Sequence, residues 1–379
     1  MFVKIREFEL ERYFAKYEFH VQYMLSPSDC EPLGLTELLG MADDECRELW
    51  STLRLSYTEP YGHPALLTEI AKRYRHAEEN GVVTAAPEEA ILLTFMALLE
   101  PGDHVVAVSP AYQSLHELPR ALGAEVTPWT LRLRDGRWTL DIEELFRLFR
   151  PETKILVLNF PHNPTGFIPT EEEYLTVLDQ AAKRGIFVLS DEMYRGLEHS
   201  AANVLPAACD FLPYAASLSG LSKGFALPGL RLGWLCSQDR AFLRRVASLK
   251  DYTTICMNAP GEILGIIALR NADRILDRSR RLVGGNLRLT EAVFARHPES
   301  LFWAPPLGGS TAFPKLSETI PVAEFCRRVV EERNLMVLPD TVFDVNWNHI
   351  RIGLGRRDYP AAIAVFEDFL GSCESSARG

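Results

Sequence analysis

The chain has 379 residues, of which 47% are hydrophobic and 24% charged, and its formal net charge is −11. This length suffices for two domains or for one large α/β domain with an appendage, and the composition is ordinary for a globular protein. The negative charge argues against nucleic acid or an anionic membrane as the main partner. The seven cysteines are scattered without a Cys-x-x-Cys pair, which predicts reduced thiols, no disulfide framework and no metal site.

The start of the chain predicts neither export nor membrane insertion. Residues 1–7 carry charges where a signal peptide needs an apolar run. No uninterrupted apolar stretch approaches the roughly 20 residues of a membrane span. We therefore expect a soluble, cytoplasmic protein.

Short apolar runs alternate with helical patterns through the middle of the chain. Buried strands are predicted at 104–109, 154–160 and 185–190, because near-continuous apolar runs of this length suit a parallel sheet covered on both faces. A helix is predicted over 170–184, with Thr170 as its N-cap. This alternation predicts an α/β fold with a parallel core.

The last third of the chain has a different pattern of predicted helices and strands. A long charged helical stretch from about residue 271 to 299 is expected to be interrupted at Gly284 and Gly285, and shorter strands and helices follow it. We place a domain boundary near residue 275. The predicted organisation is an N-terminal segment packing with the small domain (1–35), a large domain (36–275) and a smaller α+β domain (276–379).

Polar side chains follow successive strands of the predicted sheet. Asn163, Asp191 with Tyr194, and Lys223 each come just after a strand-like run, at the edge where parallel sheets bind ligands. A lysine among small and apolar residues would have a lowered pKa, which a Schiff-base lysine requires. Arg231 returns after a Pro-Gly turn, where it could grip a phosphate. Together these groups complement the aldehyde, ring nitrogen, ring oxygen and phosphate of pyridoxal phosphate.

Several short motifs occur in a characteristic order. They are Glu100-Pro101-Gly102-Asp103, Pro110-Ala111-Tyr112, Asn163-Pro164-x-Gly166, Asp191-x-x-Tyr194, and Ser222-Lys223 followed by Gly229-x-Arg231-x-Gly233-Trp234. Each is weak alone, but their order and spacing are specific, and the chain resembles the class I/II aminotransferases of fold type I. The resemblance implies a large pyridoxal-phosphate domain of mostly parallel sheet, a small domain built from both termini, and a homodimer with active sites at the subunit interface.

The resemblance also implies a role for each matching residue. Lys223 would bind the cofactor as a Schiff base and move the α-proton, and Asp191 would pair with the pyridine nitrogen so that the ring stays an electron sink. Arg351 would hold the substrate α-carboxylate, which its planar fork matches bidentately. The other contacts would be Asn163 at the ring oxygen and the substrate, Tyr194 at the ring oxygen, Ser222 and Arg231 at the phosphate, Tyr112 on the ring face, and Tyr57 at the phosphate of the neighbouring subunit.

Some of these residues have ordinary structural explanations. Taken singly, Tyr57 and Tyr112 are more often packing aromatics. Arg351 alternates with apolar residues in a strand, so a structural ion pair is a fair rival. Asn163 is a natural turn residue before proline. Glu192 is expected to pair with a nearby arginine or to lie at the surface.

Two departures from the family pattern lie at the expected phosphate site. Where members have a Gly-Ala turn, this chain has Ala86-Pro87-Glu88, and Pro87 has no N–H to donate. We therefore expect backbone donors from Ala86 or Glu88. Gly220 stands where the family usually carries a serine, so one phosphate-binding hydroxyl is lost.

The predicted reaction is amino transfer between an L-amino acid and a 2-oxo acid, and Arg351 disfavours decarboxylation because it keeps the carboxylate bound. The alternative is a non-transaminating pyridoxal-phosphate enzyme, either a C–S β-lyase or an arginine-modifying cyclase or oxidase resembling capreomycidine synthase. A cofactor-binding regulator of DNA is disfavoured because no basic patch precedes residue 35. The segment 24–33 is expected to lie over the site, where Asp29 or Glu31 would meet a cationic side chain.

Overall fold

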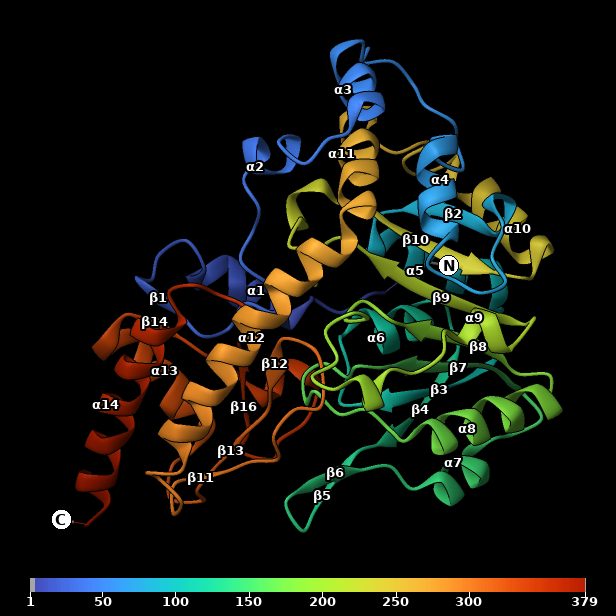
Figure 1. Cartoon of the computed structure of the whole chain (residues 1–379). Helices are drawn as coiled ribbons and strands as arrows, with labels where there is room; N and C mark the ends of the chain where they lie inside the picture. The colour runs from blue at the N-terminus through green and yellow to red at the C-terminus, as the bar shows by residue number, and fades with distance from the viewer. Residues whose placement is uncertain (1–3, 379) are drawn as a thin grey trace.

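A seven-stranded sheet forms the centre of the larger part of the molecule, and helices cover both of its faces (Figure 1). The structure is a computed structural model that describes residues 4–378, with side chains described for residues 4–374. The order of strands across the sheet is β2-β10-β9-β8-β7-β3-β4. Its strands are β2 (Val82–Ala85), β3 (His104–Ser109), β4 (Glu125–Thr130), β7 (Thr153–Asn159), β8 (Phe187–Asp191), β9 (Ala215–Gly220) and β10 (Gly233–Ser237).

Most of this sheet is parallel. Strands β4, β3, β7, β8 and β9 pair in parallel, whereas β10 is antiparallel to both of its neighbours, β9 and β2. The predicted parallel core is therefore confirmed, and β3, β7 and β8 are the three strands that the apolar runs indicate. Because β7, β8 and β9 are adjacent and parallel, the residues that follow them meet at one edge of the sheet.

Alternate side chains of the strands enter different cores, which explains their near-continuous apolar sequences. In β3, Val105 and Ala107 pack with α5, α6 and α10, while Val106 and Val108 pack with α7 and α8. The helices of this part are α3 (Asp44–Ser51), α4 (Pro64–Ala71), α5 (Pro87–Leu98), α6 (Ser114–Ala121), α7 (Ile142–Leu148), α8 (Glu171–Lys183), α9 (Ala208–Phe211), α10 (Arg240–Lys250) and α11 (Ala259–Arg270).

Helix α8 begins as the sequence predicts. The Thr170 hydroxyl accepts the N–H of Glu173, and the Glu173 carboxylate accepts the N–H of Thr170. This capping box satisfies donors that the first turn leaves free.

Helix α12 (Ala272–Phe294) connects the sheet region to the C-terminal part and is the long orange helix of Figure 1. It runs without a break through Gly284 and Gly285, so the predicted interruption there is wrong. A side chain at either glycine would meet almost nothing, whereas Val283 beside them is buried. The packing of the buried face therefore outweighs the roughly 1 kcal/mol cost of each glycine. The boundary predicted near residue 275 falls in the first turn of this helix, and the division into domains stays a prediction.

Segments from the N-terminal and C-terminal parts of the chain pack together. Strand β1 pairs in parallel with β14, and helices α12, α13 and α14 share one core that includes Phe325, Phe366 and Phe369. The elements at the N-terminal end are α1 (Glu9–Tyr17), β1 (Tyr23–Met24) and α2 (Leu35–Leu39). Those of the C-terminal part are β11 (Leu301–Phe302), β12 (Thr311–Ala312), β13 (Lys315–Leu316), α13 (Val322–Arg333), β14 (Leu335–Met336), β15 (Leu338–Pro339), β16 (Ile350–Gly353) and α14 (Tyr359–Arg378).

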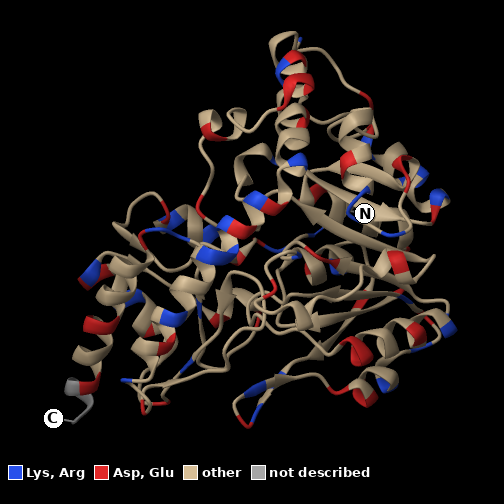
Figure 2. Ribbon diagram, viewed as in Figure 1, with Lys and Arg blue, Asp and Glu red and all other residues tan. Residues whose placement is uncertain are grey.

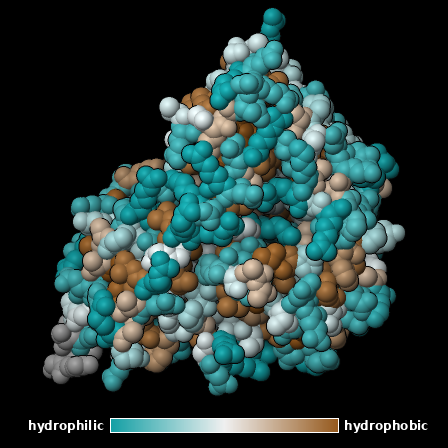
Figure 3. Space-filling view, viewed as in Figure 1, coloured by the Kyte–Doolittle hydropathy of each residue, from teal (hydrophilic) through white to brown (hydrophobic). Residues whose placement is uncertain are grey.

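Smaller elements complete the chain. A hairpin joins β5 (Arg132–Arg134) to β6 (Arg137–Thr139), and single 3₁₀ turns occur at Glu79–Gly81, Ala201–Asn203, Pro228–Leu230 and Asp340–Phe343. Lysines and arginines are interspersed with acids over the ribbon (Figure 2), and the face in Figure 3 mixes apolar and hydrophilic residues. Between residues 4 and 378, no helix is long and apolar enough to cross a bilayer. All seven cysteines are free thiols.

Candidate active site

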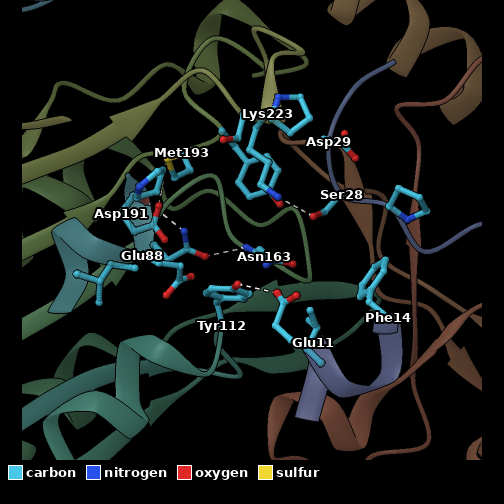
Figure 4. A pocket seen from close by; sticks show the side chains of 18 of the residues that line it. Glu11, Phe14, Ser28, Asp29, Glu88, Tyr112, Asn163, Asp191, Met193 and Lys223 are labelled. Carbon is cyan, nitrogen blue, oxygen red and sulfur yellow. Dashed lines mark hydrogen bonds between the residues drawn. The ribbon is translucent and has the colours of Figure 1, made fainter. Parts of the chain in front are cut away.

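A cavity of about 700 Å³ opens where the ends of β7, β8 and β9 face the N-terminal segment (Figure 4). The structure thus brings most of the predicted site residues together. Those that line the cavity are Glu88, Tyr112, Asn163, Asp191, Tyr194, Ser222, Lys223, Arg231 and Arg351. Tyr57 and Ala86 are not among its lining residues.

Lys223 lies in the turn between β9 and β10. The chain reverses tightly there, because the N–H of Leu221 donates to Leu232 and the N–H of Ala226 donates to the Lys223 carbonyl. The lysine amine donates a hydrogen bond to Ser28 Oγ at 2.8 Å and lies 5.8 Å from the centroid of the Tyr194 ring. The amine is therefore held in the cavity by a neutral hydroxyl and an aromatic face.

Asp191 is the last residue of β8 and is buried. Burial raises the pKa of Asp191 to about 7, and the hydrogen bond from the Met193 N–H at 3.1 Å opposes only part of that rise. Among the described residues, no lysine, arginine or histidine forms an ion pair with it. A buried carboxylate in this state favours a cationic ligand group.

A hydrogen-bonded chain connects the sheet edge to the C-terminal part. Asn159 donates to the Asp191 carbonyl at 3.1 Å and accepts the N–H of Asn163 at 2.9 Å. The Asn163 side-chain oxygen accepts from Arg351 Nη1 at 3.2 Å, and Arg351 Nη2 donates to the Ser26 carbonyl at 2.8 Å. Asn163 is therefore oriented from both sides.

Arg351, from β16, is 1% exposed and faces the same cavity. Its guanidinium lies 5.4 Å from the centroid of the Phe343 ring, and its Nε has no hydrogen-bond partner. Burial lowers the pKa of Arg351, and no carboxylate of the described chain forms an ion pair with it. The structural ion pair considered from the sequence is thus absent there, and a buried guanidinium of this kind favours an anionic ligand.

Two hydroxyls on the cavity wall also lack partners. Tyr194 Oη and Ser222 Oγ are buried without a hydrogen bond, and their residues are 3% and 5% exposed. A buried polar group without a partner costs about 1–3 kcal/mol. Because both line the cavity, a ligand with oxygen atoms in it would remove that cost.

The start of α5 differs from the expected phosphate cradle. The Ala86 N–H donates to Glu89 Oε2 at 3.3 Å, so this predicted donor serves the cap of its own helix. Glu88 instead brings a carboxyl group to the cavity wall, and burial raises the pKa of Glu88. An acid therefore stands where an anion-binding turn was expected.

Three further predicted site residues have different surroundings: Tyr112, Arg231 and Tyr57. Tyr112 lines the cavity and donates to Glu11 Oε1 at 3.0 Å. Arg231 is exposed, adopts a left-handed conformation at φ 52° and donates to the Pro228 carbonyl at 3.2 Å. Tyr57 is 82% exposed in the loop before α4, and its contact with a neighbouring subunit stays a prediction.

The N-terminal segment lies over the cavity, and of the two acids that the sequence indicated, Asp29 lines the cavity and Glu31 does not. Asp29 forms an ion pair with Arg356, with nitrogen–oxygen distances of 2.8 and 3.0 Å. Glu31 accepts the N–H of Arg357 at 3.0 Å and is not a lining residue. Neither carboxylate is therefore available to a substrate side chain in the way that was expected.

Other lining residues were missed from the sequence. Glu11, Phe14 and Glu18 come from the α1 region, and Met193 and Arg356 also contribute. Met193 had a signal, because it lies inside the motif Asp191-x-x-Tyr194. The α1 residues had none, since no motif adjoins them.

Comparison with known proteins agrees with this geometry. The family model for aminotransferase class I and II matches residues 42–359. Capreomycidine synthase from Streptomyces vinaceus is 31% identical over 84% of this chain and 81% of its own length. A PLP-dependent aminotransferase from Streptococcus suis 89-1591 superposes with a TM-score of 0.91 at 26% identity, covering 97% of this chain and 98% of its own. The PLP-dependent cyclase OrfR gives 0.87 at 27% identity, covering 97% of each chain. This chain therefore belongs to the class I and II aminotransferases, a fold type I family whose cofactor is pyridoxal phosphate.

Proposed function

We propose that this protein is an aminotransferase that moves the amino group of an L-amino acid to a 2-oxo acid. The observation that carries the proposal is the presence of Lys223 and Arg351 on one cavity, the guanidinium being buried without a carboxylate. An amino acid whose carboxylate binds Arg351 has its α-carbon in the cavity that contains the lysine amine. The carboxylate stays bound throughout, which disfavours decarboxylation.

The side chains around the cavity fit pyridoxal phosphate. When bound, this cofactor supplies the aldehyde that takes up the amino group and a ring that withdraws electron density from the α-carbon. Asp191, buried without a cation, would keep the ring nitrogen protonated. Tyr194 and Asn163 would donate to the ring oxygen, Tyr112 would cover the ring face, and Ser222 would donate to the phosphate. The free hydroxyls of Tyr194 and Ser222 support this assignment.

Lys223 is the proposed acid and base of the reaction. Its amine would take the proton from the α-carbon and return it to the cofactor carbon that has taken up the amino group. Water would then release the 2-oxo acid, with the amino group left on the cofactor. Ser28 would orient the amine through the hydrogen bond that it already accepts. Both residues line the cavity, so the amine would lie beside a substrate bound there.

A second candidate is a cyclisation in which the same proton removal expels a leaving group from the β-carbon of the substrate. A side-chain nitrogen then adds at that carbon, and the amino group stays on the product. The likeness to capreomycidine synthase over most of the chain and the structural likeness to the cyclase OrfR favour it. Both candidates need the same residues at the α-carbon. They differ in the fate of the nitrogen.

The test is to add single L-amino acids, with and without a leaving group on the β-carbon, to the cofactor-loaded enzyme without a 2-oxo acid acceptor. Amino transfer predicts the matching 2-oxo acid in an amount equal to the enzyme, and no more. Cyclisation predicts many turnovers without acceptor and a product that keeps its nitrogen. Lys223→Ala is expected to lower either rate at least about a thousandfold. If Lys223→Ala kept its rate, both candidates would be excluded.

The proposal includes a homodimer. The loop that carries Leu55 and Tyr57 and the loop that carries Tyr252 expose large apolar side chains. A hydrogen bond from Thr58 to the Met257 carbonyl at 3.3 Å joins the two loops. Exposed apolar groups of this kind mark contact surfaces. Light scattering is expected to give twice the chain mass, and a monomer at micromolar concentration would contradict this part.

A further inference from the structure

The α1 region places two glutamates on the cavity wall. Glu11 and Glu18 line the cavity together with Phe14, and this spacing of three and four residues puts all three on one face of the helix. Figure 4 shows Glu11 and Phe14 projecting from α1, with the Glu11 carboxylate beside Tyr112. Glu18 follows the last turn of the helix and is half-buried.

These two carboxylates lack a cation. Asp29 and Arg356 at the same end of the cavity neutralise each other through their ion pair. Among the described residues, no lysine, arginine or histidine forms an ion pair with Glu11 or Glu18. Burial raises the pKa of Glu18, the charges of Asp29 and Glu11 add to the rise, and Arg356 opposes it. This end of the cavity is therefore electronegative.

A second observation points to a ligand that has charges at both ends. Arg351 lines the same cavity, is buried, and keeps its Nε without a partner, so it favours a carboxylate. Phe14, between the two glutamates, offers an apolar face for methylene groups or for a flat cation. A basic amino acid presents these three features: a carboxylate, an aliphatic chain and a terminal cation.

We propose that Glu11, Phe14 and Glu18 form a subsite for the cationic side chain of the substrate, a guanidinium or an ammonium group. The proposal rests on the proposed function, because it concerns the side chain of an amino acid whose α-carboxylate binds Arg351. Glu18 is the cleaner probe of the pair, since Glu11 also accepts the Tyr112 hydroxyl.

The experiment compares L-arginine with L-citrulline, which has nearly the same shape but no charge. Their dissociation constants are measured on the cofactor-loaded enzyme by calorimetry, and kcat/KM is measured beside them. We expect arginine to bind about 10–100-fold more tightly than citrulline. Glu18→Gln is expected to remove most of this preference by weakening arginine alone. Glu31→Gln, outside the cavity, is the matched control and should leave both constants unchanged.

The outcomes separate the subsite from the reaction. The subsite would be overturned if the enzyme bound arginine and citrulline equally tightly, or if Glu18→Gln weakened the binding of both equally. In that case, conversion of L-norleucine would still support the reaction. Conversely, a preference for arginine in calorimetry without turnover of any amino acid would keep the subsite and exclude the reaction. Tighter binding of L-2-aminoadipate than of arginine would assign the side-chain contact to Arg356 and overturn the proposal. If Glu18→Gln does not fold, Glu18→Lys is used, which should reverse the preference toward L-2-aminoadipate.

Discussion

The two walls of the active-site cavity are held in place in different ways. On the sheet side, Asn163, Asp191 and Lys223 lie at or just after the end of a strand, and short-range bonds help to hold this wall, as when Asn159 accepts the N–H of Asn163. On the α1 side, the wall is held by distant parts of the chain, through the ion pair of Arg6 with Asp344 and the pairing of β1 with β14. The first wall has the groups for the chemistry, and the second has the groups that we assign to substrate choice.

Among the substitutions that test this comparison, Arg351→Lys is expected to change kcat/KM the most. Lysine cannot reproduce the bidentate fork, so kcat/KM should fall about 10–100-fold for every amino acid, whatever its side chain. Steady-state kinetics with arginine, norleucine and 2-aminoadipate measure this. A change in the ranking of these substrates, with no general loss, would place Arg351 on the side-chain end of the cavity instead.

Asp191→Asn tests how much the buried Asp191 carboxylate on the sheet wall lowers the stability of the protein. Because burial raises the folded-state pKa of Asp191 from 3.8 to about 7, the proton-bound form favours folding, and this contribution is lost as pH rises through that window. In the cofactor-free protein, the stability that Asp191→Asn gains over the wild type should therefore be about 1–2 kcal/mol larger at pH 8 than at pH 5.

Denaturant unfolding of the cofactor-free protein at the two pH values measures this difference. Glu18→Gln on the α1 wall serves as the comparison, since Glu18 is less buried and should change stability less. If the free energy of unfolding changed with pH in the same way in the wild type and in Asp191→Asn, the buried Asp191 carboxylate would not destabilise the cofactor-free protein.

Glu88→Gln is expected to give the smallest effect. The carboxylate at the start of α5 repels a phosphate, so the substitution should tighten binding of pyridoxal phosphate about 5-fold at pH 8. Because burial raises the pKa of Glu88, the wild type should bind more tightly as pH falls, and the gain should shrink. Absorbance titration measures the constants, and pyridoxal without phosphate is the control. An equal gain with pyridoxal would place Glu88 away from the phosphate.

The difference between the walls also explains what the sequence could predict. The parallel strands and the positions of Asn163, Asp191 and Lys223 follow from local patterns, because a strand and the turn after it are set by neighbouring residues. The continuous helix at Gly284 was not predictable in this way, since burial of its other face decides it. Likewise, the sequence did not predict that the Asp29 carboxylate is paired, because its partner, Arg356, is more than 300 residues away in the chain.

The pairing of β1 with β14 has a consequence for synthesis on the ribosome. Tyr23 lies opposite Leu335, so β1 has no partner until the chain has been made as far as β14. At about 5–20 residues per second, this wait is on the order of tens of seconds, during which the central sheet emerges and can begin to pack. The α1 wall is therefore added to an existing sheet edge, and the cavity is completed only after β14 and β16 have been made.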